Sequence, residues 1–125
     1  MATDIAGTVV YLTRKQMKID LRPKWLDMIQ QILAIHLPEA EVLAYGSRVS
    51  GAAHEGSDLD LVARNPHNQM LPVRNLGEVR DAFTESNLPI LVDIQDWARI
   101  PDSFREEIAR TGVVIFPGDV RKNRP

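Results

Sequence analysis

The spacing of apolar and polar positions along the chain predicts helices and strands that alternate. Apolar residues recur at helical spacing after Pro23, which suits a first helical turn, and Pro38 ends that pattern, so the first helix is expected between them. Two further helices are expected over 76–83 and from Pro101 to Thr111. Short apolar runs predict four strands, over 42–45, 59–63, 90–94 and 113–116. This order is typical of an α/β layered structure.

Composition restricts the class of protein and its surroundings. The chain has 125 residues, enough for one domain, and its formal net charge of −2 provides no overall basic field, so we expect no direct nucleic-acid binding. Cysteine is absent, which excludes disulfides, thiolate nucleophiles and cysteine-ligated zinc, and fits a reducing cytosol. No apolar run approaches the roughly 20 residues that cross a bilayer, and no signal peptide is evident. We therefore predict a cytoplasmic protein without membrane contact.

The domain is expected to occupy residues 17–118. Residues 1–16 follow no clear pattern and are predicted to be an N-terminal extension, either a short strand or an unpacked leader. Residues 119–125 contain Arg121, Lys122 and Arg124 and are predicted to be a solvated basic tail.

A glycine turn after the strand over 42–45 is the first candidate functional element. Gly46 lets the backbone turn sharply and lets a phosphate approach closely. If a helix begins at Ser47, its first amides are unpaired and point toward that phosphate. Ser47 adds a hydroxyl donor and Arg48 adds positive charge from the flank. Gly46, Ser47 and Arg48 are the predicted nucleotide-binding residues, although a Gly-Ser pair after a strand is by itself most often an ordinary turn.

Two aspartates that alternate with leucines form the second element. On a strand, Asp58 and Asp60 would share one face, with Cα atoms about 6.6 Å apart, twice the strand rise. Like charges on one face repel unless a cation lies between them, and Mg²⁺ prefers carboxylates, waters and substrate phosphates. Two such ions, about 3.5–4 Å apart, stabilise both ends of a phosphoryl displacement. The alternative interpretation is an exposed Asp-x-Asp edge strand without function.

A third aspartate interrupts the apolar run over 90–94. Residues 90, 92 and 94 can face the core while Asp93 points to the other face. An aspartate in such a strand is costly without a partner, so a neighbouring strand that carries Asp58 and Asp60 would explain it. Asp93 is then predicted to be a metal ligand, or the base that takes a proton from the attacking hydroxyl.

The order Gly46-Ser47, ten residues, Asp58-x-Asp60 and a later lone Asp93 resembles the signature of the nucleotidyltransferase (polymerase beta) superfamily. The short chain, with a helix expected to begin near Pro23, is similar to the minimal nucleotidyltransferases, the MNT proteins. The resemblance implies a small mixed β-sheet with helices packed on one face. It also implies that Gly46 and Ser47 hold the triphosphate of ATP, that Asp58 and Asp60 bind Mg²⁺, and that Asp93 is the third acid.

The chain departs from the family pattern at Ser50, where many relatives carry a basic residue. This loss of charge is expected to weaken triphosphate binding.

The resemblance also implies a partner protein. Minimal members often act beside an all-helical HEPN protein, in a toxin–antitoxin pair in which the nucleotidyltransferase neutralises the HEPN ribonuclease, in some cases by transferring AMP to it. One hypothesis is therefore a Mg²⁺-dependent enzyme that modifies such a toxin. A second is a catalytically weak or inactive antitoxin that acts by binding alone. A third, transfer to a small molecule such as an aminoglycoside, is weakest because so small a chain has no acceptor-binding domain. The sequence leaves oligomerisation open.

Overall fold

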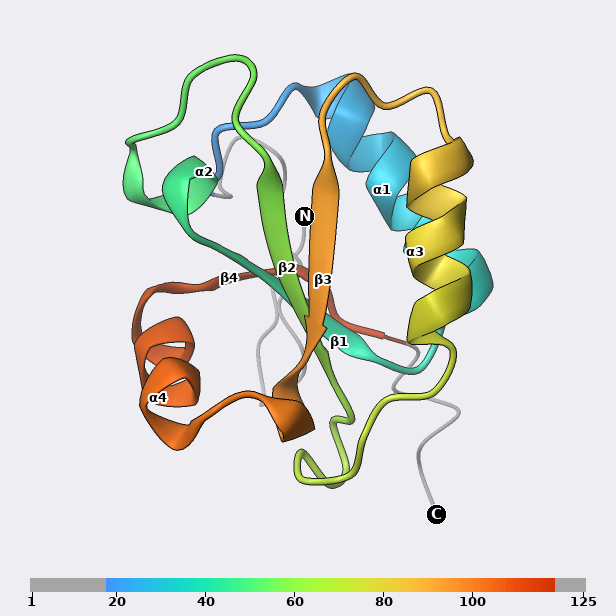
Figure 1. Ribbon diagram of the computed structural model, residues 1–125, viewed down its shortest axis with the longest axis vertical. Coiled ribbons are helices and arrows are strands. Elements are labelled where there is room, and N and C mark those ends of the chain that lie inside the picture. The colour runs from blue at the N-terminus through green and yellow to red at the C-terminus, as the bar shows by residue number, and fades with distance from the viewer. Residues whose placement is uncertain (1–17, 119–125) are drawn as a thin grey trace, which may run out of the picture.

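A computed structural model describes residues 18–118 and shows helices and strands alternating around one sheet (Figure 1). The predicted extension over 1–16 and the predicted tail over 119–125 lie outside these residues. The elements are α1 (Pro23–His36), β1 (Glu41–Tyr45), α2 (Ser47–Ser50), β2 (Leu59–Arg64), α3 (Leu76–Glu85), β3 (Val92–Asp96), the 3₁₀ turn η1 (Trp97–Arg99), α4 (Asp102–Thr111) and β4 (Val113–Phe116).

The four strands form a mixed sheet in the order β3-β2-β1-β4. β1 pairs antiparallel with both β2 and β4, whereas β2 and β3 run parallel. The parallel pair arises because α3 carries the chain back across the sheet between β2 and β3, as a parallel connection requires. This arrangement confirms the predicted α/β class and its small mixed sheet.

One face of the sheet is fully covered by α1 and α3. Alternate residues of a strand point to the same face, and on β2 this face carries Leu59, Leu61 and Ala63. Their side chains are completely buried beneath the two helices. The helices bury their own apolar stripes against this face, among them Leu33 of α1 and Val79 of α3. Most of the hydrophobic core lies in this layer.

The opposite face is covered in part, which differs from the expected packing of all helices on one face. Leu43 of β1 and Val62 of β2 point to this side, and they are buried with Trp97 of η1 and Ile108 of α4. Figure 1 shows α1 and α3 to one side of β2 and β3, and α4 to the other. The physical reason is that the apolar side chains on this face must also be removed from water.

β3 begins two residues later than its apolar run predicts. Ile90 is buried in the core, but pairing with β2 starts at Val92, which lies opposite Leu59. The apolar run over 90–94 therefore includes a buried residue that precedes the strand, whereas the first residue of β3 is determined by its pairing with β2.

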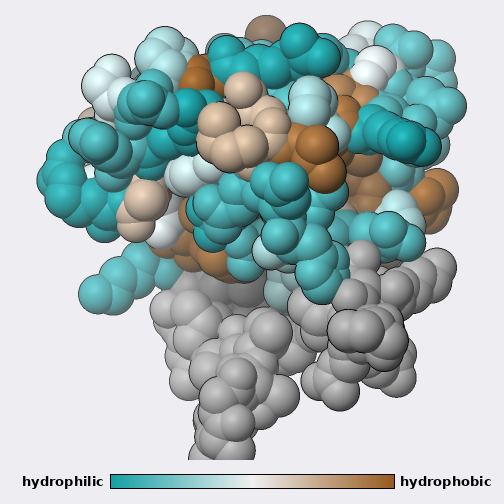
Figure 2. Space-filling model, turned by 90° about the horizontal axis from the view of Figure 1, so that it is seen from below, coloured by the Kyte–Doolittle hydropathy of each residue, from teal (hydrophilic) through white to brown (hydrophobic). Residues whose placement is uncertain are grey.

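The two ends of the parallel strands differ in character. The loop over 65–75, which joins β2 to α3, lies at the lower end of Figure 1 and exposes Met70 and Leu71. Seen from that end, the surface has hydrophobic residues scattered among hydrophilic ones (Figure 2). β2 and β3 both start at the upper end, where the predicted site residues gather. Within residues 18–118, no helix is long and apolar enough to span a membrane.

Candidate active site

Asp60 and Asp93 lie side by side on neighbouring strands. They are direct register partners in the parallel pairing of β2 with β3, and paired strands are separated by about 4.8 Å. Both residues belong to the incompletely covered face, since Leu59, Leu61 and Ile94 on either side of them point into the core. Asp93 is exposed and Asp60 is partly buried. The predicted convergence of these two acids is thus present in the fold.

The electrostatics of the pair favour a bound cation. Burial raises the pKa of the Asp60 carboxyl above its ordinary value, and the charges of Asp93 and then Asp58 raise it further. The ionised form of Asp60 is therefore less favourable in the protein than in water. A positive charge placed between these carboxylates would remove the repulsion.

Asp58 takes a different position from the one expected. β2 begins at Leu59, so Asp58 is the last residue of the loop between α2 and β2 and is exposed to solvent. The predicted distance for two residues on one strand does not apply to it. Its charge nevertheless acts on Asp60, so the three acids share one electrostatic environment.

Gly46 packs directly against the Asp60 carboxylate. Its backbone has φ 81° and ψ −153°, a conformation that favours glycine. A Cβ atom at this position would lie 2.6 Å from Oδ2 of Asp60, closer than such atoms approach one another. α2 begins at Ser47, as expected, and the Gly46 carbonyl accepts hydrogen bonds from the Val49 and Ser50 amides, each at 3.0 Å. The glycine turn and the acids are therefore one site.

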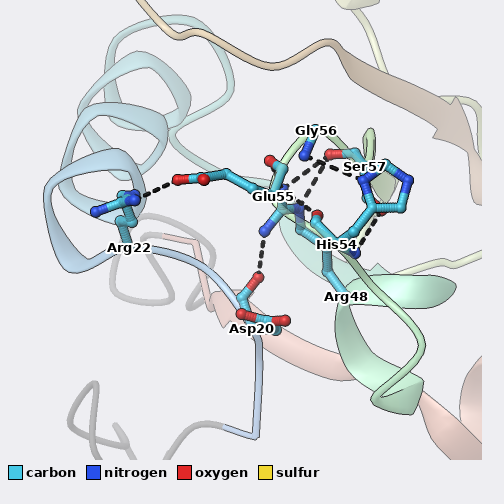
Figure 3. A network of polar contacts seen from close by, with 7 residues as sticks. All are labelled: Asp20, Arg22, Arg48, His54, Glu55, Gly56 and Ser57. Atoms are coloured by element: carbon cyan, nitrogen blue, oxygen red, sulfur yellow. Dashed lines mark hydrogen bonds and ion pairs between the residues drawn. The ribbon is translucent and has the colours of Figure 1, made fainter.

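Arg48, which the sequence predicts to add charge beside a triphosphate, has its side chain inside the protein. Its side chain is buried, with 4% exposed, and its guanidinium donates to the backbone carbonyls of Asp20, His54, Glu55 and Ser57 (Figure 3). The structure thus brings Gly46 to Asp60 and directs the Arg48 side chain into the protein.

Ser50, which stands where a basic residue is common, is exposed at the end of α2. Its hydroxyl lies 3.4 Å from both the Ser47 carbonyl oxygen and the Ala52 amide. These contacts are local to the turn.

Two residues of the site were missing from the sequence-based prediction. Tyr45 lies directly opposite Asp60 in the β1–β2 pairing, and its ring meets Phe104 edge to face with centroids 5.3 Å apart. Burial, followed by the charges of Asp60 and Asp93, raises the pKa of Tyr45 to about 12. The Gln95 side chain donates to Oδ2 of Asp93 at 3.0 Å. Strand alternation provided the signal, because both residues share the face that carries these acids.

Asp96, three residues after Asp93, caps η1. Its carboxylate accepts from the Ala98 amide at 3.2 Å and from the Val73 amide at 3.1 Å. Asp96 is the last residue of β3, at the opposite end of the strand from Val92, and lies outside the site.

The chemistry of the donors fits Mg²⁺, although the described part of the chain holds no ready-made group of three or more acidic or histidine side chains in ligating positions. Hard carboxylate oxygens are the ligands that Mg²⁺ takes from proteins, usually one or two of them together with waters and substrate phosphates. Asp60 and Asp93 provide such a pair, with Asp58 nearby and a glycine turn alongside. The residues present thus match a metal that substrate phosphates help to hold.

A mixed sheet with paired carboxylates beside a strand–glycine–helix turn defines a nucleotidyltransferase palm. Residues 1–110 match the family described as the central palm domain of mitochondrial-like poly(A) RNA polymerase, and the chain belongs to this family. It is a nucleotidyltransferase of the minimal, MNT type.

Two further comparisons agree with this class. The chain is 38% identical over 110 residues to the probable protein adenylyltransferase MntA of Haemophilus influenzae, covering 86% of this chain and 93% of that protein. Its fold resembles a solved structure described as the crystal structure of the toxin-antitoxin with AMP-PNP, with a TM-score of 0.59, 19% identity, and coverage of 78% of this chain and 76% of that one.

Proposed function

We propose that this nucleotidyltransferase transfers AMP from ATP to a hydroxyl group of a HEPN toxin and so acts as its antitoxin. The observation that carries the proposal is the contact of Gly46 with Asp60, which itself pairs with Asp93. This contact supports a site in which the Gly46 turn binds phosphate next to acids that bind Mg²⁺. The name of the MntA relative, a probable protein adenylyltransferase, supports a protein acceptor, and the AMP-PNP of the structural neighbour supports an adenine nucleotide.

The reaction requires little covalent chemistry from the protein. The acceptor oxygen forms a bond to the α-phosphorus, the bond from that phosphorus to the bridging oxygen breaks, and pyrophosphate leaves. Gly46 and Ser47 would hold the triphosphate, while Asp58, Asp60 and Asp93 would hold Mg²⁺, two ions in our proposal. When bound, Mg²⁺ neutralises phosphate charge and orients the reacting groups. Gln95, which donates to Asp93, orients that carboxylate, whether it serves as a ligand or accepts the proton of the acceptor hydroxyl.

The size of the domain is consistent with an acceptor on a second protein. In the described residues, the face that carries Asp60 is bordered by η1 and α4, and Asp93 is exposed on it. An acceptor on a second protein has access to this exposed face. A tyrosine hydroxyl is a suitable group, since its oxygen can reach a site that lies open at the surface.

The test uses ATP labelled at its α-phosphate, Mg²⁺, this chain and the proposed HEPN partner. We expect label on the partner protein, and loss of at least about a hundredfold in rate for Asp60→Asn and Asp58→Asn. Asp81→Asn, which changes an exposed aspartate of α3, is the matched control and should label normally. If the toxin is neutralised equally well by Asp60→Asn without any label transfer, the chain is an antitoxin by binding alone and the proposal is wrong.

A further inference from the structure

A buried arginine joins α2 to the loop that precedes the acids. Arg48 is 4% exposed, and a charge removed from water is costly unless polar groups surround it. The loop over 51–58 runs from the end of α2 to the start of β2 and ends at Asp58. Arg48 lies beneath this loop, with its guanidinium directed at the loop backbone (Figure 3).

The guanidinium binds the loop through backbone carbonyls. Nε and Nη2 donate to the Ser57 carbonyl at 3.1 and 3.0 Å, and Nη2 also contacts the carbonyls of Glu55 at 2.8 Å and His54 at 3.3 Å. The Ser57 carbonyl belongs to the peptide bond that leads into Asp58. The orientation of that peptide, and with it the direction in which Asp58 leaves the loop, therefore depends on Arg48.

The loop also has hydrogen bonds of its own, which form a compact turn above the arginine. The His54 amide donates to Oγ of Ser57 at 2.9 Å, and the Ser57 amide donates to the His54 carbonyl at 3.0 Å. The Gly56 amide donates to Nδ1 of His54 at 3.2 Å. These bonds shape the turn, whereas Arg48 attaches it to the rest of the domain.

The other end of the attachment is the segment before α1. Nη1 of Arg48 donates to the Asp20 carbonyl at 2.7 Å, and the Asp20 amide donates to the Arg48 carbonyl at 2.7 Å. The guanidinium carbon lies 5.8 Å from the centroid of the Trp25 ring, which adds a cation–π contact. At the surface, Arg22 forms an ion pair with Glu55 of the loop. Arg48 is thus fixed by the segment before α1 through Asp20, and by the first turn of α1 through Trp25.

We propose that Arg48 is a positioning residue, which places Asp58 beside Asp60 and Asp93 by holding the Ser57–Asp58 peptide, and that it makes no contact with the triphosphate. The role of Asp58 in this proposal rests on the proposed function. The attachment of the loop by Arg48 is independent of the proposed function. The planar fork of arginine suits this task because several donors leave one rigid group in different directions, an arrangement that a lysine ammonium cannot reproduce.

The first test measures the loop without metal or nucleotide. In Arg48→Lys and Arg48→Met, we expect the His54 and Ser57 amides to exchange with solvent at least about tenfold faster, because the loop loses its attachment. The Leu59 amide, which donates to the Leu91 carbonyl, should keep its protection and shows that the sheet is intact. Arg22→Gln removes the exposed ion pair to the same loop and should change little. Unchanged exchange at His54 and Ser57 in both Arg48 variants overturns the proposal.

The second test asks whether Arg48 acts through Asp58. We expect Arg48→Lys to weaken binding of Mn²⁺ with a non-hydrolysable ATP analogue about 10- to 100-fold, the usual effect of removing a residue that orients a metal ligand. In an Asp58→Asn background the same substitution should have almost no further effect. Additive losses in the double variant would mean that Arg48 contacts the nucleotide itself, and they would overturn the proposal.

A milder variant covers the case in which loss of Arg48 prevents folding. Ser57→Ala removes the acceptor of the His54 amide and leaves Arg48 in place, so it should loosen the loop and weaken Mn²⁺–nucleotide binding in the same direction by less. Equal binding by Ser57→Ala and the unchanged protein contradicts the dependence on loop geometry. If the unchanged protein itself binds no Mn²⁺–nucleotide, the proposed function fails, whereas the exchange test still decides whether Arg48 holds the loop.

Discussion

The two faces of the sheet are formed by the same strands but carry different kinds of side chain, apolar on one face and acidic on part of the other. On one face, Leu59 and Leu61 of β2 are completely buried beneath α1 and α3. On the other, Asp60 from the same strand stands next to Asp93 and Tyr45, and α4 covers only the apolar part around Val62. Successive side chains along a strand therefore have different environments, because they point to opposite faces of the sheet.

This difference separates stability from chemistry within one strand. The covered face removes apolar surface from water, which is the main favourable contribution to folding. The open face keeps carboxylates close together at a cost in free energy, since Asp93 and Asp58 both disfavour the ionised form of Asp60. The comparison predicts that substitutions on one face reduce stability, whereas substitutions on the other reduce binding and transfer.

The largest effect on stability is expected on the covered face. Leu61→Ala removes a side chain with 0% exposure and should lower the free energy of unfolding by about 2–5 kcal/mol, because a cavity remains in a packed core. Chemical denaturation measures this loss. Leu91→Ala, at a side chain that is 73% exposed, is the control and should change stability by less than about 0.5 kcal/mol. Equal losses for both leucines would contradict the assignment of the core to this face.

Gly46→Ala tests the contact between the turn and the acids. The new Cβ would meet Oδ2 of Asp60 at 2.6 Å, and the positive φ of 81° strains any other residue, so we expect a loss of about 1–3 kcal/mol together with weaker nucleotide binding. Thermal unfolding and nucleotide titration report the two effects. Gly77→Ala in α3 meets no atom within 4 Å and should be neutral, or stabilising by up to about 1 kcal/mol. Full nucleotide binding by Gly46→Ala would show that the turn lies apart from the site.

Tyr45→Phe sharpens the comparison at high pH. Since the pKa of Tyr45 is raised from 10.0 to about 12, the unfolded chain releases this proton first, and stability is lost as pH rises from 10 through 12. The phenylalanine variant should lack this part of the loss, about 1 kcal/mol after allowance for solvent screening of a half-exposed group. Unfolding free energies at pH 8 and at several points up to pH 12 measure it. Parallel curves for the two proteins would mean that the phenol is not in this environment.

The smallest effect is expected from Asp60→Asn in the absence of metal. Because the folded protein raises the pKa of Asp60, its favourable contribution is complete below the ordinary pKa and is lost as pH rises through the raised value. At neutral pH the ionised carboxylate is unfavourable, so the variant in EDTA should be more stable by under about 1 kcal/mol. Added Mg²⁺–ATP should stabilise the unchanged protein and have no effect on Asp60→Asn. A variant less stable than the unchanged protein in EDTA would mean that the carboxylate is favourable where it lies.

Most of the fold could be predicted because its signals are local. Prolines mark the helix starts, since Pro23 is the first residue of α1 and Pro101 directly precedes α4. Strand alternation places Asp60 and Asp93 on a common face. The start of β3 could not be predicted, because it depends on where pairing with β2 begins, and the burial of Ile90 gives it the apolar character of a strand residue.

The environment of Arg48 could not be read from the sequence either. Its acceptors are backbone carbonyls, which every residue has, and Asp20 comes near them only in the folded chain. The position of α4 could not be predicted for a similar reason. α4 covers Leu43 and Val62 on a face of the sheet that, judged from its aspartates in the sequence, was expected to be wholly polar.

Paramagnetic broadening of backbone amide signals by Mn²⁺, with a non-hydrolysable ATP analogue present, tests the central claim most directly. We predict that broadening is strongest at Gly46, Asp60 and Asp93 and weakest in α1 and on the far side of α3. Asp60→Asn should abolish it. Broadening centred on α1, α3 or the loop over 65–75, or broadening that persists unchanged in Asp60→Asn, would contradict the claim that the open face of the sheet holds the metal and the nucleotide.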